Sequence, residues 1–243
     1  MDHIKDYKEQ LLEAYPYKIE MHAHTTPVST CSRVTPEQMV QLYSAIGFDA
    51  VVITNHFLME MFKNRTKEEA ISYYINDFEK TRELGEKVGI KILLGAEVRF
   101  TENVNDYLLY GTNREQLLEL ADLLPYGIEH FRKTFDLSGS VFLQAHPFRD
   151  SMERVDPSLL DGIETYNMHP EHNARIAVAA RYARENDFKI EIAGSDFHYP
   201  DQNHEGLAAL RTKTLPSNSY ELAKLLRSGD YVMEIGQHSI IIP

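Results

Sequence analysis

The chain has 243 residues, of which 43% are hydrophobic and 26% charged, with a formal net charge of −12 at pH 7. This composition is typical of a globular protein, and no apolar run reaches the roughly 20 residues that cross a bilayer. The acidic balance argues against a broad nucleic-acid surface, and the single cysteine, Cys31, suits a reducing compartment. We therefore expect one cytoplasmic domain over residues 1–243, without a signal peptide or a membrane partner.

The first half of the chain contains three predicted strands that each lead into polar residues. After a polar lead-in at 2–16, a strand over 18–24 ends in His22 and His24. A helix from Thr35 to about 46 follows, and a buried strand at 49–54 leads into His56. A helix at 66–88 precedes a strand at 90–97 that ends in Glu97. The short strand expected at 106–111 would pair with it in a hairpin.

The second half continues the alternation of helices and strands. Two short helices interrupted near Pro125 are predicted within 113–139, and a strand at 140–145 leads into His146. The remaining expected elements are a strand at 160–167, a helix at 171–185, a strand at 188–195, a helix at 219–227 and a strand at 231–235. Alternation of this kind predicts a largely parallel sheet, and about seven strands in one α/β domain favour a TIM-like barrel. A doubly wound sheet is the alternative, but the chain has neither a G-x-G-x-x-G motif nor a Walker A loop.

Imidazoles and carboxylates stand where these strands end: His22, His24, His56, Glu97, His146, Asp196 and His198. Side chains at i and i+2 of a strand share a face, so His22 and His24 can reach one point. The composition favours divalent ions such as Zn²⁺, Mn²⁺ or Fe²⁺, and seven candidates exceed the four ligands of one tetrahedral zinc. The residues therefore predict two or more ions, with Glu97 able to bridge them, a centre suited to displacement at phosphorus.

Five motifs in this order resemble those of the PHP (polymerase and histidinol phosphatase) superfamily: His22-Ala23-His24-Thr25, Thr54-Asn55-His56, Gly95-Ala96-Glu97, Ala145-His146-Pro147 and Gly194-Ser195-Asp196-Phe197-His198. The resemblance implies a distorted (β/α)7 barrel, two or three divalent metal ions and phosphoester hydrolysis. It also implies a division of the ligands. The H-x-H pair, Glu97 and Asp196 would hold one metal, and Glu97 and His146 would help to hold a second. His56 and His198 would serve a third metal or a substrate-side site.

The chain departs from the family pattern at three places. Asn55 stands where Asp is usual, and the loop after the H-x-H pair offers Thr30 and Cys31 in place of a further His or Asp ligand. Asp106 stands where a metal-site His often precedes the short strand, and it is a candidate metal ligand because carboxylates bind hard ions. Whether Asp106 or His130 is a ligand, and whether the third site is complete, stays open.

Arginine forks suit phosphate oxygens, so Arg149 and Arg33 are candidates to hold the substrate. His198 or His56 would stabilise or protonate the leaving oxygen, which makes these two the other candidate catalytic residues beside Arg149. His169 and His172 are expected behind the ligands or at the surface, and His3, His204 and His238 are given no role.

We expect a metal-dependent phosphomonoesterase that hydrolyses a small phosphorylated substrate with a metal-bridged hydroxide. The alternatives are an amidohydrolase-type metal hydrolase and a metal-binding domain without activity. Histidinol phosphate, a nucleotide and an oligonucleotide end stay open as substrates, as do the identity of the metal and the oligomeric state.

Overall fold

The computed structural model describes residues 2–202, 207–236 and 239–243. Its helices are α1 (Asp2–Ala14), α2 (Pro36–Ala45), α3 (Lys67–Val88), α4 (Arg114–Leu123), α5 (Gly127–Thr134), α6 (Ile176–Glu185) and α7 (Ser219–Ser228), with 3-10 turns η1 (Met59–Phe62), η2 (Leu124–Tyr126) and η3 (Pro157–Leu159). Its strands are β1 (Tyr17–Ala23), β2 (Ala50–Ile53), β3 (His56–Phe57), β4 (Lys91–Val98), β5 (Tyr107–Tyr110), β6 (Val141–Gln144), β7 (Gly162–Asn167), β8 (Ile190–Gly194), β9 (Ala208–Thr212), β10 (Tyr231–Ile235) and β11 (Ser239–Ile241).

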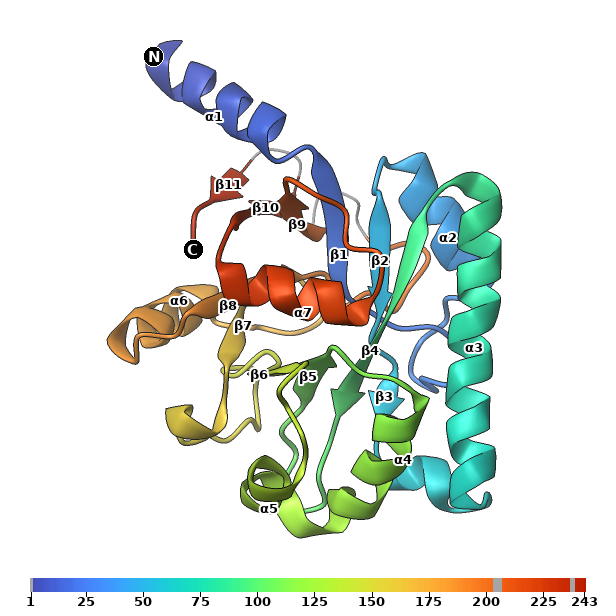
Figure 1. Cartoon of the computed structure of the whole chain (residues 1–243). Helices are drawn as coiled ribbons and strands as arrows, with labels where there is room; N and C mark the ends of the chain where they lie inside the picture. Colours follow the sequence, from blue (N-terminus) through green and yellow to red (C-terminus); the bar gives the residue numbers. More distant parts are fainter. Residues whose placement is uncertain (1, 203–206, 237–238) are drawn as a thin grey trace.

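The strands form one curled sheet in the order β11-β10-β9-β1-β2-β4-β5-β6-β7-β8, with β3 beside β4 (Figure 1). A parallel bridge between Ala23 and Phe197 brings the far end of the sheet back to β1. There Phe197 N donates to His22 O at 3.1 Å, and His24 N donates to Phe197 O at 3.0 Å. The result is a mixed α/β half-barrel consistent with the distorted TIM-like fold expected from the sequence.

The sheet is less parallel than the alternation of elements predicted. The strand groups β1-β2-β4 and β6-β7-β8 are parallel, but β5 runs antiparallel to both of its neighbours. The predicted hairpin of β4 with β5 is therefore confirmed. The edge formed by β9, β10 and β11 is also antiparallel and attaches to β1 through β9.

Most predicted elements form where the local sequence indicated. Thr35 and Thr66 cap α2 and α3 through capping boxes, and Gly89 ends α3 in the left-handed region. The predicted helix at 171–185 is shorter than expected, because Arg175 adopts φ 48° and α6 begins only at Ile176. Strands β3, β9 and β11 were not predicted.

Alternate residues of the strands enter two separate apolar cores. Val51 and Ile53 join the cluster beneath α2 and α3, whereas Ala50 and Val52 join the cluster on the concave side of the sheet. Helix α7 fills part of that concave side, with Leu222 and Leu226 fully buried (Figure 1). Along β4, Leu93 belongs to the concave cluster, so Glu97, four residues further on, shares its face. In the part of the chain that is described, no helix is both long and apolar enough to cross a membrane.

Candidate metal centre

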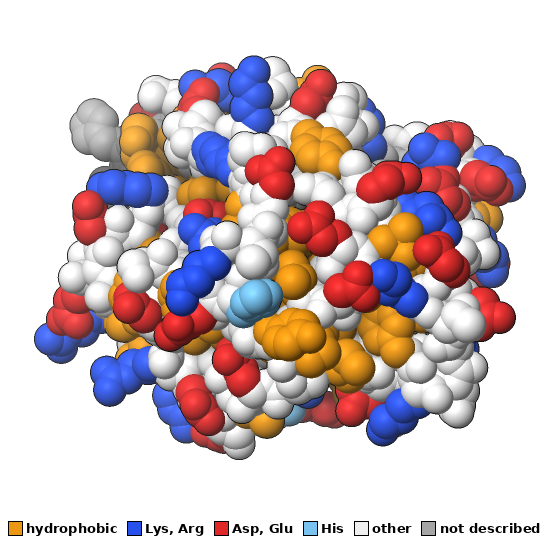
Figure 2. All heavy atoms as spheres, turned by 60° about the horizontal axis from the view of Figure 1, so that its bottom comes forward, with side chains coloured by type: hydrophobic (Ala, Val, Ile, Leu, Met, Phe, Trp, Pro, Cys, Tyr) orange, Lys and Arg blue, Asp and Glu red, His pale blue; other side chains and the backbone are white. Residues whose placement is uncertain are grey.

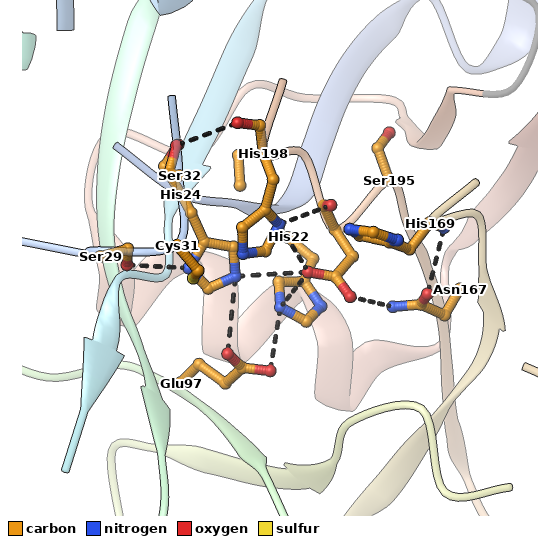
Figure 3. Close-up of polar contacts among 12 residues, drawn as sticks. His22, His24, Ser29, Cys31, Ser32, Glu97, Asn167, His169, Ser195 and His198 are labelled. Atoms are coloured by element: carbon orange, nitrogen blue, oxygen red, sulfur yellow. Dashed lines mark hydrogen bonds and ion pairs between the residues drawn. The ribbon is translucent and has the colours of Figure 1, made fainter. Parts of the chain in front are cut away.

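Glu97 is the hub of a buried cluster that contains the predicted ligands. Its Oε1 lies 3.2 Å from His22 Nε2 and 3.1 Å from His146 Nε2. Its Oε2 lies 3.5 Å from His24 Nε2 and 2.6 Å from His56 Nδ1. Histidines from three separate stretches of the chain thus converge on one carboxylate, and Figure 3 shows His22 and His24 pointing toward it.

Asp196 forms the second acidic side of the cluster. Its Oδ1 lies 3.6 Å from His22 Nε2, 3.5 Å from His24 Nε2 and 3.2 Å from His198 Nδ1. Its Oδ2 accepts a hydrogen bond from Arg149 Nη1 at 3.3 Å. All seven strand-end residues predicted as ligands, together with Arg149, therefore lie in one cluster.

Two of these residues have left-handed backbones, with φ 29° at His146 and φ 49° at Asp196. A non-glycine residue pays roughly 1–3 kcal/mol for such a conformation, which persists only where its surroundings hold it. The backbone N of His146 is held by Glu164 Oε2 at 2.9 Å. Strain of this kind concentrates at functional sites.

Hydrogen bonds to Nδ1 fix the orientation of two of the imidazoles. His22 Nδ1 lies 2.9 Å from Glu164 Oε1, and His198 Nδ1 lies 2.9 Å from the carbonyl O of Asp196. An ionised carboxylate and a carbonyl can only accept. In the neutral form of each ring, therefore, Nδ1 carries the proton and Nε2 keeps its lone pair. This is the arrangement in which an imidazole binds a metal ion.

A longer chain of hydrogen bonds fixes His24 in the same way. Asn55 Nδ2 donates to Asp77 Oδ2, which leaves Asn55 Oδ1 to accept from the hydroxyl of Ser29 at 2.9 Å. The Ser29 hydroxyl donates its only proton to Asn55. Its Oγ therefore accepts from His24 Nδ1 at 3.1 Å. Asn55 therefore bonds to Asp77 and Ser29 and helps to orient His24, a predicted ligand.

Glu164 was not predicted from the sequence, although it supports two of the predicted ligands. It holds His22 Nδ1 and His146 N, and it also accepts from Asn167 Nδ2 at 2.9 Å. Gly194 makes room for it: a Cβ at Gly194 would lie 2.4 Å from Glu164 Oε1. The sequence offered only an acid within the predicted strand 160–167, and its full burial beside these partners appears only in the structure.

The electrostatics of the cluster favour cations. Burial lowers the pKa of His22, but the carboxylates of Glu164, Asp196 and Glu97 outweigh burial and raise it well above its usual value. Burial raises the pKa of Glu97, but His56 and His22 outweigh it and hold the pKa well below its usual range. The negative charge that retains a proton on His22 would also attract a divalent ion, which would replace that proton.

The donor atoms fit such ions. Among the described residues, the buried Nε2 atoms of His22 and His24 have no hydrogen-bonding partner. Three sets of donor atoms each lie within 4.8 Å of one another: His24, His56 and His198; His22, His24 and Asp196; and His56, Glu97 and Asp106. Overlapping sets of this kind fit a centre of more than one metal, as the sequence predicted.

Asp106 and His130 differ in their distance from this centre. Asp106 Oδ2 lies 3.8 Å from His146 Nε2, but both carboxylate oxygens accept from Arg99 at 2.7 Å. Its role as a ligand stays a prediction. His130 is exposed on α5, where its ring packs on Tyr126, so the structure does not bring it to the cluster.

Three further side chains border the centre. Burial raises the pKa of the Cys31 thiol, but contacts with His198 and His56 lower it to about 6. Arg33 lies over the Tyr199 ring, and the buried His169 packs edge-on against His198. His204 and His238 lie outside the described residues, as does the side chain of His3.

The PHP domain family model matches residues 20–236. The chain is similar in structure to a two-domain protein from Bacteroides vulgatus described as containing a predicted PHP-like metal-dependent phosphoesterase, with a TM-score of 0.63 and 19% identity, over 90% of this chain and 65% of that one. This chain therefore spans less than two thirds of that protein.

Two other solved structures are also similar. For PsfC from Pseudomonas syringae PB-5123 the TM-score is 0.63 at 15% identity, over 91% of this chain and 92% of that one. For an amidohydrolase from Chromobacterium violaceum with bound sulfate and no metal, it is 0.52 at 15% identity, over 75% and 88%. At these identities the likeness shows the fold alone. No curated protein matches the chain.

Proposed function

Because this chain belongs to the PHP domain family, we propose that it is a metal-dependent phosphomonoesterase acting on a small phosphorylated substrate. The observation that carries the proposal is Glu97, a buried carboxylate within 3.5 Å of nitrogens from His22, His24, His56 and His146. Two or three divalent ions held by these residues with Asp196 and His198 would activate water and clamp the attacking and leaving oxygens.

The residues at the edge of the cluster suit the binding of phosphate. Arg149 is about one-fifth exposed and faces Asp196 at 3.3 Å, so its guanidinium is fixed beside the centre and still reachable from solvent. Planar forks of this kind hold phosphate oxygens in a defined orientation. His56, whose Nε2 lies 3.1 Å from Cys31 Sγ, and His198 would stabilise the leaving oxygen.

A cavity next to His56 supports a small leaving group. It has a volume of about 160 Å³ and is lined by Pro27, Val28, Thr30, His56, Leu58, Glu60, Met61, Arg65 and Tyr73. A space of this size suits a compact group. On the face shown in Figure 2, Lys and Arg are interspersed with Asp and Glu, with no basic field that would suit a nucleic-acid backbone.

The proposal predicts release of inorganic phosphate from small phosphate monoesters by the purified protein with Mn²⁺ or Zn²⁺. The variants His22→Ala and Asp196→Ala should lose about a hundredfold in rate, because losing one ion forfeits about 3 kcal/mol of transition-state stabilisation. Phosphate release by the wild type no faster than by the two variants would refute the function. Parallel assays on amide substrates test the amidohydrolase alternative, and bound metal without any turnover identifies a domain that has lost activity.

Glu164→Gln tests the support of His22 separately from the ligands themselves. Glutamine keeps the size of the side chain but removes the charge that holds the His22 Nδ1 proton, so we expect metal affinity to fall roughly 10- to 100-fold. Competition with a chromogenic chelator measures the affinity. The matched control is Glu191→Gln, since Glu191 lies on the neighbouring strand and its carboxylate accepts from Thr165 Oγ1. Equal affinities in the two variants would contradict the role given to Glu164.

A further inference from the structure

Three imidazoles on the Cys31 side of the cluster pack closely around one another. The rings of His24 and His198 are 4.2 Å apart between centroids, and those of His24 and His56 are 4.6 Å apart. Donor atoms of all three lie within 4.8 Å of one another. His24 Nε2 is buried without a hydrogen-bonding partner among the described residues. Crowded imidazoles with free lone pairs are an arrangement that a cation stabilises.

The loop after β1 holds Cys31 against this group. Ser32, the next residue, donates from Oγ to His24 O at 2.9 Å, and Arg33 N donates to His198 O at 2.9 Å. The loop is thereby bonded to the backbone of two of the three histidines (Figure 3). Cys31 Sγ lies 3.1 Å from His56 Nε2, and the rings of His56 and His198 are 6.0 Å apart between centroids.

We propose that Cys31 is a metal ligand, and that its sulfur completes a third ion site with His56 and His198. The site rests on the proposed function, because it adjoins the ions held around Glu97. In this chain the thiol takes the place of the loop ligand, His or Asp, that the sequence lacks.

The geometry suits a tetrahedral ion. With metal–sulfur and metal–nitrogen bonds of about 2.3 and 2.0 Å, two ligand atoms of one tetrahedron are separated by about 3.5 Å, close to the 3.1 Å between Cys31 Sγ and His56 Nε2. Glu97 Oε2 lies 2.6 Å from His56 Nδ1. The carboxylate therefore orients the His56 ring and leaves Nε2 available to bind the ion. Three protein ligands leave one position open for an oxygen of water or substrate.

The ligand set also defines the class of ion. One sulfur and two imidazole nitrogens favour borderline ions such as Zn²⁺, Co²⁺ or Fe²⁺ over Mn²⁺ and Mg²⁺, which prefer oxygen. Formation of the sulfur–metal bond releases the thiol proton to solvent. The third site would therefore prefer a different metal from a site in which a carboxylate took the place of the Cys31 thiolate.

Cobalt substitution tests this directly, because Co²⁺ bound by a thiolate gives a charge-transfer band in the near ultraviolet. The chain has one cysteine, so such a band has no source other than Cys31. We expect the band in the wild type loaded with Co²⁺. In Cys31→Ser we expect the band to be lost, with one cobalt ion fewer per chain by elemental analysis. Cys31→His should recover the ion count without the band.

The outcomes separate this inference from the function. A wild type that binds cobalt as fully as Cys31→Ser, without the band, overturns the thiolate ligand and leaves the phosphoesterase proposal standing. A wild type that binds no cobalt overturns both. The wild-type spectrum alone decides the matter if Cys31→Ser does not fold, which circular dichroism would reveal.

Discussion

Replacing Glu97 with glutamine is expected to lower phosphate release at least about a thousandfold, the largest loss among the variants considered. Glu97 is buried and lies within 3.5 Å of four imidazoles, so in the proposed centre its charge would contribute to more than one ion. Loss of about 4 kcal/mol of transition-state stabilisation corresponds to three orders of magnitude. The amide nitrogen of glutamine would also place a donor against ligand nitrogens. Steady-state kinetics in Mn²⁺ or Zn²⁺ give the rate, and elemental analysis gives the accompanying loss of metal.

Glu191→Gln is the matched control for this substitution, because it makes the same chemical change on a strand of the same sheet away from the cluster. Its rate and metal content should remain those of the wild type. If Glu97→Gln kept both its metal and its rate within a few-fold of Glu191→Gln, Glu97 would not be the bridging ligand.

Chelation of the metal is expected to lower the thermal unfolding midpoint by about 5–10 °C for each site emptied. An ion at a hundred times its dissociation constant contributes about 2.7 kcal/mol to the folded state. For a domain of this size, each kcal/mol shifts the midpoint by about 2–4 °C. The reason is that emptying the proposed sites would leave buried carboxylates without a cation, together with the Nε2 atoms of His22 and His24, which have no hydrogen-bonding partner among the described residues.

Scanning calorimetry before and after EDTA treatment, followed by readdition of Zn²⁺, measures this shift. The midpoint should return with zinc in the wild type and should respond far less in Glu97→Gln. Identical unfolding curves with and without chelator would mean that the cluster does not bind the ions it is proposed to bind.

The cluster could be predicted because each ligand follows an apolar strand in the sequence. The periodicity of a strand places His22 and His24 on one face, and a buried run such as 90–96 makes the position of Glu97 at its end conspicuous. Convergence then required only that the strand ends meet, which barrels of this kind provide. The N-terminal ends of α2 and α3 could also be predicted from the sequence, because a capping box is a local signal.

What could not be predicted depends on contacts between distant segments. Glu164 looks like any acid in a strand until His22, 142 residues away, is placed beside it. The orientation of His24 runs through Ser29 and Asn55 to Asp77, which join only in three dimensions. Strand β9 was not predicted, because its two alanines have low β-propensity and it pairs with β1, which is far away in the sequence.

The junction between β1 and Phe197 involves two of the predicted ligands, His22 and His24, through their backbones. The backbones of His22 and His24, whose side chains face Glu97 and Asp196, also make the hydrogen bonds by which the sheet returns on itself. Mechanical loosening of this seam would therefore shift both rings at once. The proposed metal centre and the return of the sheet to β1 thus depend on the same few backbone atoms, so a substitution that disturbs one is expected to disturb the other.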